Sequence, residues 1–108
     1  FTSVTVANCL REDAPRKEEI SAQVLVGTPG TLLELERRRL VNFSNVKVFV
    51  LDEADGMLDK QGMGLQSMRI IKLCPENCQL LLFSATFSEA VIEFAHMIIP
   101  NANEITLK

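Results

Sequence analysis

Three carboxylates follow an apolar run near the middle of the chain, and these side chains are the best placed to do chemistry. Five of the six residues in 46–51 are apolar, three of them valines, and Asp52, Glu53 and Asp55 come next. An apolar run rich in β-branched residues predicts a strand buried on both faces, as in a parallel sheet. Acids at the carboxyl end of such a strand lie where open α/β sheets bind ligands. One acid there can hold a nucleotide's Mg²⁺, and a neighbouring acid can orient the attacking water.

Two interpretations of these acids stay open on the tetrapeptide alone. Carboxylates also suit the first turn of a helix, where they interact favourably with the helix macrodipole. A second motif follows downstream, where an apolar strand predicted at 79–83 leads directly into Ser84, Ala85 and Thr86. Hydroxyl groups both donate and accept hydrogen bonds, so they can link a carboxylate to other groups.

A third polar segment follows the strand predicted at 24–26. Thr28 can cap a helix with Pro29 in its first turn, or Thr31 can cap it with Glu34 closing a capping box. Either start points backbone amides out of the carboxyl edge of the sheet, which suits a phosphate group. A simple turn through Thr28, Pro29 and Gly30 is the alternative.

Together, Asp-Glu-Ala-Asp at 52–55, Ser-Ala-Thr at 84–86 and Thr-Pro-Gly at 28–30 resemble motifs II, III and Ib of the DEAD-box RNA helicases. The resemblance runs from about residue 4 to residue 107. It implies an α/β fold, a three-layer α/β/α parallel sheet of the RecA-like P-loop NTPase type. Residues 1–108 would form the C-terminal part of the first helicase lobe.

The resemblance also implies cofactors and roles. The cofactors would be ATP and Mg²⁺, with Asp52 holding the metal through water, because Mg²⁺ keeps much of its hydration shell. Glu53 would position or activate the attacking water. Asp55 would hydrogen-bond toward Ser84 and Thr86, and toward the second lobe.

RNA contacts follow from the same resemblance. Thr28, Pro29 and Gly30 match an RNA-backbone turn of the family, and Gln66 and Arg69 match its Gln-x-x-Arg pair. Gln66 and Arg69 are three residues apart and therefore share a helix face. A solvated glutamine and arginine would give the same pattern. The family usually has arginine after the glycine, whereas this chain has a threonine at 31, so the arginine contact is not carried over.

Three segments, 20–31, 47–51 and 77–79, look most like the DEAD-box helicases of nuclear mRNA export. That likeness implies a protein that remodels RNA–protein complexes, located in cytoplasm and nucleus and at the nuclear pore. The implied partners are RNA, the second lobe of the same parent chain, a nucleoporin and an mRNA-export activator.

Composition narrows the class of protein. With 108 residues, 47% hydrophobic and 23% charged, the chain suits one small globular domain. Its apolar runs are too short to span a membrane. Three cysteines and one histidine make neither a disulfide framework nor a zinc site, and they point to a reducing compartment. A net charge of −3 lowers the expected affinity for RNA without excluding a helicase lobe.

The predicted elements alternate as in a parallel α/β sheet. Strands are expected at 4–7, 24–26, 46–51, 79–83 and 105–107. Helices are expected from Pro15 to Ile20, over 32–40, 56–59 and 64–73, and from a cap at Ser88 to Pro100. The side chains expected to point inward from the last two of these helices are Leu65, Met68, Ile70 or Ile71, Leu73, Val91, Ile92, Ala95, Ile98 and Ile99.

Several family elements are missing from the sequence. No Gly-x-x-x-x-Gly-Lys-Ser/Thr loop occurs in the 108 residues, so we expect the chain alone to be inactive as an ATPase and a helicase. The chain begins with Phe1 and is expected to be a piece of a longer protein. Without the Walker A strand, residues 80–83 should form an open apolar edge. We expect that the isolated chain either self-associates through this edge or has the edge covered by residues outside these 108.

Two alternative functions remain. One is a non-catalytic truncated paralogue that serves as a binding scaffold or competitor. The other is a helicase of a different branch that acts on DNA, against which Ala54 and Ser-Ala-Thr at 84–86 argue.

Overall fold

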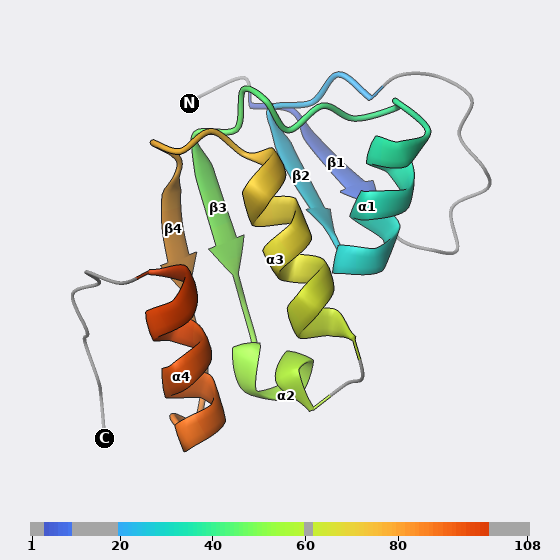
Figure 1. Cartoon of the computed structure of the whole chain (residues 1–108). Coiled ribbons are helices and arrows are strands. Elements are labelled where there is room, and N and C mark those ends of the chain that lie inside the picture. The colour runs from blue at the N-terminus through green and yellow to red at the C-terminus, as the bar shows by residue number, and fades with distance from the viewer. Residues whose placement is uncertain (1–3, 10–19, 60–61, 100–108) are drawn as a thin grey trace.

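The computed structural model describes residues 4–9, 20–59 and 62–99 as four strands and four helices (Figure 1). The strands are β1 (Val6–Cys9), β2 (Val24–Gly27), β3 (Val48–Leu51) and β4 (Gln79–Leu82). The helices are α1 (Pro29–Arg37), α2 (Ala54–Leu58), α3 (Met63–Leu73) and α4 (Glu89–Ile98). The parallel α/β class predicted from the sequence is confirmed. The helix predicted at Pro15 and the strand predicted at 105–107 lie outside the described residues.

The four strands form two separate parallel pairs. β1 pairs with β2, so that Val6 lies opposite Val24, and β3 pairs with β4, so that Val48 lies opposite Gln79. All four strands point the same way, which brings their carboxyl ends to one edge (Figure 1). Within the described residues no ladder joins β2 to β3. An open edge at β4 was expected from the sequence, whereas these further open edges were not.

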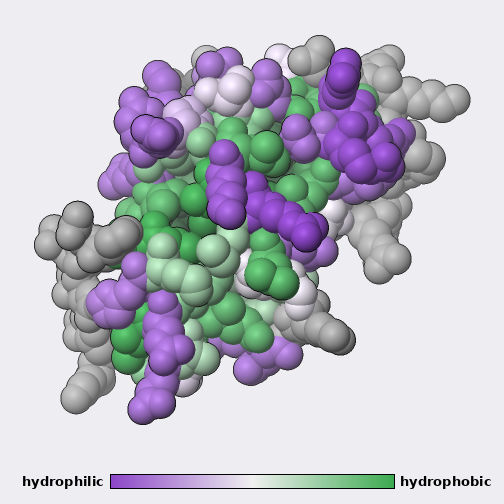
Figure 2. Space-filling view, viewed as in Figure 1, coloured by the Kyte–Doolittle hydropathy of each residue, from purple (hydrophilic) through white to green (hydrophobic). Residues whose placement is uncertain are grey.

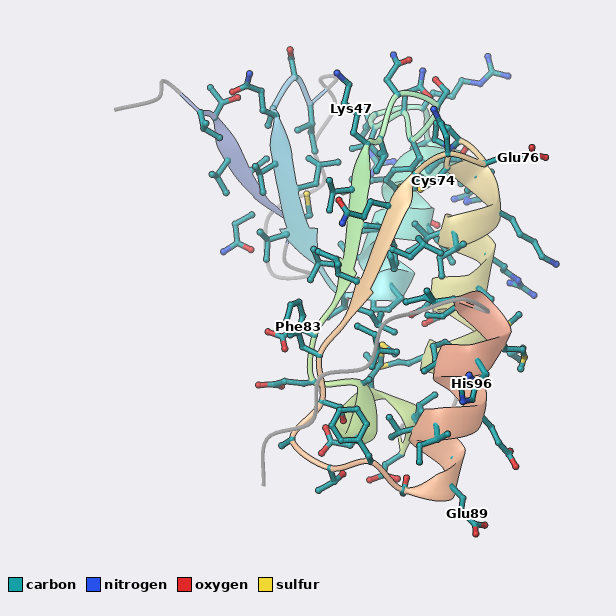
Figure 3. All side chains as sticks on the ribbon, turned by 90° about the vertical axis from the view of Figure 1, so that its left-hand side faces the viewer. Lys47, Cys74, Glu76, Phe83, Glu89 and His96 are labelled. Carbon is teal, nitrogen blue, oxygen red and sulfur yellow. The ribbon has the colours of Figure 1, made fainter. Side chains whose placement is uncertain are left out.

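Helices α1, α3 and α4 all lie on one side of the strands (Figures 1 and 3). Successive side chains of a strand point to opposite faces, and only one face is covered here. Leu51 points under the helices and is 5% exposed, whereas Val48 and Val50 are 48% and 52% exposed. The prediction that the central strand is buried on both faces is therefore wrong for the described part of the chain. Val6, Val24 and Val26 are exposed on β1 and β2 as well.

The core consists of two clusters that share helix α3. The first cluster contains Cys9, Leu35, Leu40, Val41, Phe43, Ile70 and Cys74. The second contains Leu51, Ala54, Met57 and Phe94. Helix α3 supplies Ile70 to the first, and its Met63 and Met68 pack against the second. Figure 2, viewed from the helix-covered side, shows apolar surface between stretches of polar side chains.

Helix α1 begins at Thr28 and Pro29, the first of the two predicted starts. Thr28 is the N-cap residue, but its hydroxyl donates to Thr31 Oγ1 at 3.0 Å and does not cap the backbone. The alternative capping box is absent, because Glu34 forms an ion pair with Arg37 at 2.6 Å. The helix ends before the predicted residue 40, since Arg39 adopts a left-handed conformation with φ 60°. The amide of Leu40 then donates to the carbonyl of Leu35 at 2.9 Å, which closes the helix end.

Helix α4 begins as predicted, with the amide of Val91 donating to Ser88 Oγ at 3.3 Å. Its buried face is centred on Val91 and Phe94, and Ile92, expected inward, is 40% exposed. Leu65 was also expected inward on α3 but is 67% exposed. Leu73, also expected inward, is 41% exposed. Helix α3 buries Ile70, which was expected inward, and Ser67, which was not; these two residues are three apart and therefore share a face. Helical spacing predicted both helices, but not which of several apolar faces meets the sheet.

Candidate functional site

The predicted site residues gather at the carboxyl edge of the strands, where parallel strands present their ends together. Thr28 follows β2, Asp52 follows β3, and Ser84 follows β4 after one intervening residue. Helix α2 and the first turns of α1 and α4 lie at the same edge (Figure 1). The order of elements thus places all three motifs on one side of the molecule.

Asp52 and Glu53 occupy the connection between β3 and α2, and both are exposed. The amide of Glu53 donates to Asp52 Oδ1 at 2.8 Å. Glu53 itself is left-handed, with φ 54° and ψ 46°. Few residues other than glycine adopt this conformation, and such strain is concentrated at functional sites.

Asp55, Ser84 and Thr86 form a closed loop of hydrogen bonds between α2 and the segment after β4. The amide of Asp55 donates to Ser84 Oγ at 3.2 Å, and Ser84 Oγ donates to the carbonyl of Thr86 at 2.7 Å. Thr86 Oγ1 donates to Asp55 Oδ2 at 2.9 Å. The resemblance to the DEAD-box helicases predicted that Asp55 bonds to Ser84 and Thr86, and the structure contains these hydrogen bonds.

The same hydrogen bonds lower the pKa of the Asp55 carboxyl. The Thr86 hydroxyl, and after it the Gly56 amide, hold the pKa of the Asp55 carboxyl below its ordinary value. Partial desolvation opposes this shift in pKa, and Ser84 adds to it. The carboxylate is therefore ionised at neutral pH and accepts a charge-assisted bond from Thr86, which is stronger than a bond between neutral groups.

The predicted RNA-contact residues form a second group, where the first turn of α1 meets α3. A Cβ atom on Gly30 would lie 3.3 Å from Gln66 Nε2, so the Gln66 amide packs directly over this turn. Thr28 and Thr31 are joined there by their hydroxyls. Arg69 is exposed on α3, three residues after Gln66. Pro29 occupies the first position of α1.

Asp52 is the carboxylate that the sequence analysis predicted to hold a divalent metal. The described residues contain no group of three or more His, Cys, Asp or Glu side chains able to hold a metal ion together. Mg²⁺ is compatible with a single protein carboxylate, because nucleotide phosphates and water supply its other ligands. Asp52 Oδ1 already accepts the Glu53 amide, which leaves Oδ2 for a metal-bound water. The site thus fits Mg²⁺ bound together with a nucleotide.

The cysteines do not contribute to the site. Cys9, Cys74 and Cys78 form no disulfide, and burial raises the pKa of Cys74 to about 11, with a further contribution from Cys78. A thiol with a raised pKa is a poor nucleophile and metal ligand. His96 lies exposed on α4, away from the Asp-Glu-Ala-Asp segment (Figure 3).

Ala54 and Phe83 contribute to the site through main-chain hydrogen bonds that the sequence analysis did not predict. Ala54 is fully buried, and its amide donates to the carbonyl of Phe83 at 3.1 Å. The Phe83 amide donates to the carbonyl of Leu51 at 2.8 Å. These are main-chain bonds, and their pattern depends on strand register rather than on residue type.

Parallel strands that carry an acidic motif and a Ser-Ala-Thr motif at one edge define a RecA-like helicase core. A structure of Saccharomyces cerevisiae Dbp5 bound to RNA and ADP BeF3 superimposes with a TM-score of 0.89 and 48% identity, over 99% of this chain and 27% of that one. A variant of S. cerevisiae Dbp5 bound to Nup159, Gle1, IP6 and ADP gives 0.88 and 49%, over 94% of this chain and 27% of that one.

Residues 2–94 match the family model described as DEAD/DEAH box helicase. The chain belongs to this family. It is 53% identical over its full length to the ATP-dependent RNA helicase dbp5 of Schizosaccharomyces pombe, of which it covers 22%. It thus spans about a fifth of the length of the curated relatives it matches.

Proposed function

We propose that this chain is the C-terminal part of the first RecA-like lobe of an ATP-dependent DEAD-box RNA helicase. The parent protein would couple ATP hydrolysis to RNA binding and to remodelling of RNA and RNA–protein complexes. The observation that carries the proposal is the hydrogen-bonded loop of Asp55, Ser84 and Thr86 beside Asp52 and Glu53. It joins two motifs that are remote in sequence and whose combination is typical of this class of helicase.

Each acid has a separate role in this proposal. Bound Mg²⁺ would supply charge stabilisation to the nucleotide phosphates. Asp52 would hold the metal through water by its free carboxylate oxygen, and Glu53 would accept a hydrogen bond from the attacking water and aim it. Asp55, ionised and held by Thr86, would fix the Ser-Ala-Thr segment at the surface where the second lobe closes.

The RNA-binding role falls to the first turn of α1 and the adjoining face of α3. Amides at a helix N-terminus and hydroxyls bind phosphate oxygens without base specificity. Thr28, Pro29 and Gly30 would follow the RNA backbone, while Gln66 and Arg69 would extend the contact along α3. Packing of Gln66 over Gly30 supports a single continuous surface. The Dbp5 structure bound to RNA and ADP BeF3 supports the same substrate class.

Residues outside this chain would complete the domain. The 108 residues include no phosphate-binding loop, so this chain alone would neither bind ATP tightly nor hydrolyse it. Among the described residues, the exposed valine face and the open edges of β2, β3 and β4 support the view that further strands and helices pack here. In isolation the chain would self-associate through these edges. Light scattering that shows a stable monomer would contradict this.

The cellular role follows from the relatives. S. cerevisiae Dbp5 binds Nup159 and Gle1, so we extend to the parent protein a nucleoporin and an export activator as partners. The parent would act in mRNA export, in cytoplasm and nucleus and at the nuclear pore. Among the described residues no helix is long and apolar enough to cross a membrane.

The experiment that tests the proposal is Glu53→Gln in the intact parent protein. RNA-stimulated ATP hydrolysis should be lost, while nucleotide and RNA affinities stay within about threefold, because charge at the attacking water matters in the transition state. Glu93→Gln, a matched change of an exposed carboxylate on α4, should leave hydrolysis unchanged. Normal turnover in Glu53→Gln would refute the assignment.

Two controls separate the alternative functions. A scaffold or competitor would show no RNA-stimulated hydrolysis even as the wild-type parent protein. A DNA-acting helicase would be stimulated by single-stranded DNA as strongly as by RNA. Stimulation by RNA alone would exclude both alternatives.

A further inference from the structure

The hydrogen bonds between β3 and β4 depart from a regular ladder at the residues after β3. The amide of Gln79 donates to Lys47 at 2.9 Å and the amide of Phe83 donates to Leu51 at 2.8 Å. In a regular parallel ladder, a residue that donates to position i−1 of its neighbour accepts from position i+1. Phe83 should therefore accept from the amide of residue 53. It accepts instead from the amide of Ala54, at 3.1 Å.

A regular ladder would have one residue between Leu51 and the residue that donates to Phe83, but here there are two, Asp52 and Glu53. One residue is therefore inserted, and we take it to be Glu53. An inserted residue that interrupts a ladder is a β-bulge, and a left-handed residue is typical of one class of bulge. Glu53 has φ 54°, while glycine usually occupies such a position. Its amide, displaced from the ladder, donates to Asp52 Oδ1 at 2.8 Å.

The bulge changes the direction in which Glu53 points. In an uninterrupted strand, residues 51 and 53 would point to the same face. Leu51 lies under the helices with 5% of its surface exposed, and a carboxylate beside it would be buried without a partner. With the bulge, Ala54 takes the buried place, at 0% exposure, and Glu53 faces solvent.

We propose that this bulge is the device that aims the Glu53 carboxylate, and that Asp52 and the Phe83 main chain are its positioning groups. Asp52 then has two functions, one for each oxygen: Oδ1 holds the Glu53 amide, and Oδ2 remains for the metal-bound water. The catalytic part of this inference rests on the function proposed above, whereas the geometric part does not.

Crystal structures of Asp52→Asn and Asp52→Ala in the intact parent protein test the geometric part. Asparagine keeps an oxygen at Oδ1, so residue 53 should stay left-handed with its amide on that oxygen. Alanine removes the acceptor, and residue 53 should leave the left-handed region. An unchanged Glu53 in Asp52→Ala, or a lost bulge in Asp52→Asn, would overturn the role of Asp52.

An amide-to-ester change at residue 54 tests whether the bulge serves catalysis. Replacing Ala54 by lactate removes the N–H that donates to Phe83, and it also weakens the Glu53 carbonyl as the acceptor of the Met57 amide. Because misplacement of a catalytic group by about 1 Å costs about 100-fold in rate, we expect kcat to fall by about that factor. KM for ATP and for RNA should stay within about threefold, since the bond does not contact either ligand.

The matched control is the equivalent ester at Ile92, whose amide donates to Ser88 at 3.0 Å within α4. It removes one helix bond remote from the acids and should leave kcat unchanged. A kcat at the wild-type level in the residue 54 ester, or equal losses in both esters, would overturn the positioning role. Failure of Glu53→Gln to abolish hydrolysis would overturn the proposed function instead, and the crystal structures would still decide the geometry.

Discussion

A methyl group added to Gly27 tests how closely β1 and β2 pack at the edge that carries Thr28. Gly27 lies opposite Cys9 in the ladder. A Cβ atom on Gly27 would lie 2.7 Å from the carbonyl oxygen of Cys9 and 3.1 Å from its Cβ. Neither atom belongs to the flexible end of a side chain, and Cys9 is only 2% exposed. The strands must therefore move apart to admit alanine.

Overpacking of this kind costs about 1–3 kcal/mol. Because the shorter contact is with a main-chain atom, we expect Gly27→Ala to destabilise by about 2–3 kcal/mol, near the upper end of that range. That loss is a large part of the stability of a domain, which is typically about 5–15 kcal/mol.

Gly56→Ala adds the same methyl group, but we expect it to raise the free energy of unfolding rather than lower it. Gly56 lies within α2, and apart from its chain neighbours and the backbone of its own helix, no described atom comes within 4 Å of the position that a Cβ atom would occupy. Alanine there removes the entropic penalty of glycine in a helix and should stabilise by about 0.5–1 kcal/mol. Urea unfolding followed by circular dichroism measures both variants. The packing argument would be refuted if Gly27→Ala were as stable as the wild-type protein, or if both variants changed the free energy of unfolding in the same direction.

Three further changes test single contacts. Thr86→Val removes the main donor to Asp55, so the pKa of that carboxyl should rise toward 3.8 in a carbon-detected NMR titration. In the wild-type protein the pKa of the Asp55 carboxyl is lower in the folded than in the unfolded state, so the ionised carboxylate stabilises the fold. This stabilisation is complete above pH 3.8 and is lost as the pH falls through the pKa of the folded state. The stability of the variant should therefore depend less on pH in this acidic range. Ser88→Ala removes the cap of α4 and should cost about 1 kcal/mol in thermal unfolding, whereas Ser44→Ala, in an exposed turn, should cost almost nothing. Arg39→Gly should be more stable than Arg39→Ala by about 1 kcal/mol, because both lose the charge but only glycine relieves the left-handed strain; equal stabilities would contradict the helix-end geometry.

The strands and their direction could be predicted because apolar runs and turn residues are local signals. Val24–Gly27 and Gln79–Leu82 lie within a residue of their predicted bounds. The contact of Asp55 with Thr86 was predicted from the resemblance to the DEAD-box helicases, and the structure has this hydrogen bond. The functional roles of the site residues stay predictions.

The parts that sequence missed depend on packing and register. Leu65 and Val91 look equally apolar in the sequence, but which one is buried depends on the rotation of each helix against the strands. The bulge at Glu53 depends on how many residues separate two bonds to Phe83, and no residue type encodes that. The bare face of Val48 and Val50 arises because no described helix lies there.

The absence of a ladder between β2 and β3, within the part of the chain that the structure describes, has a mechanical consequence. Hydrogen bonds resist sliding along a sheet, but among the described residues no ladder joins these two strand pairs, and the packing of side chains, chiefly those of α3, holds them together. Packed side chains permit small shear displacements that a continuous sheet does not. Thr28 belongs to one pair and Asp52 to the other. A strand that paired with both edges would therefore prevent this displacement and fix the spacing between the turn at Thr28 and the acids that follow β3.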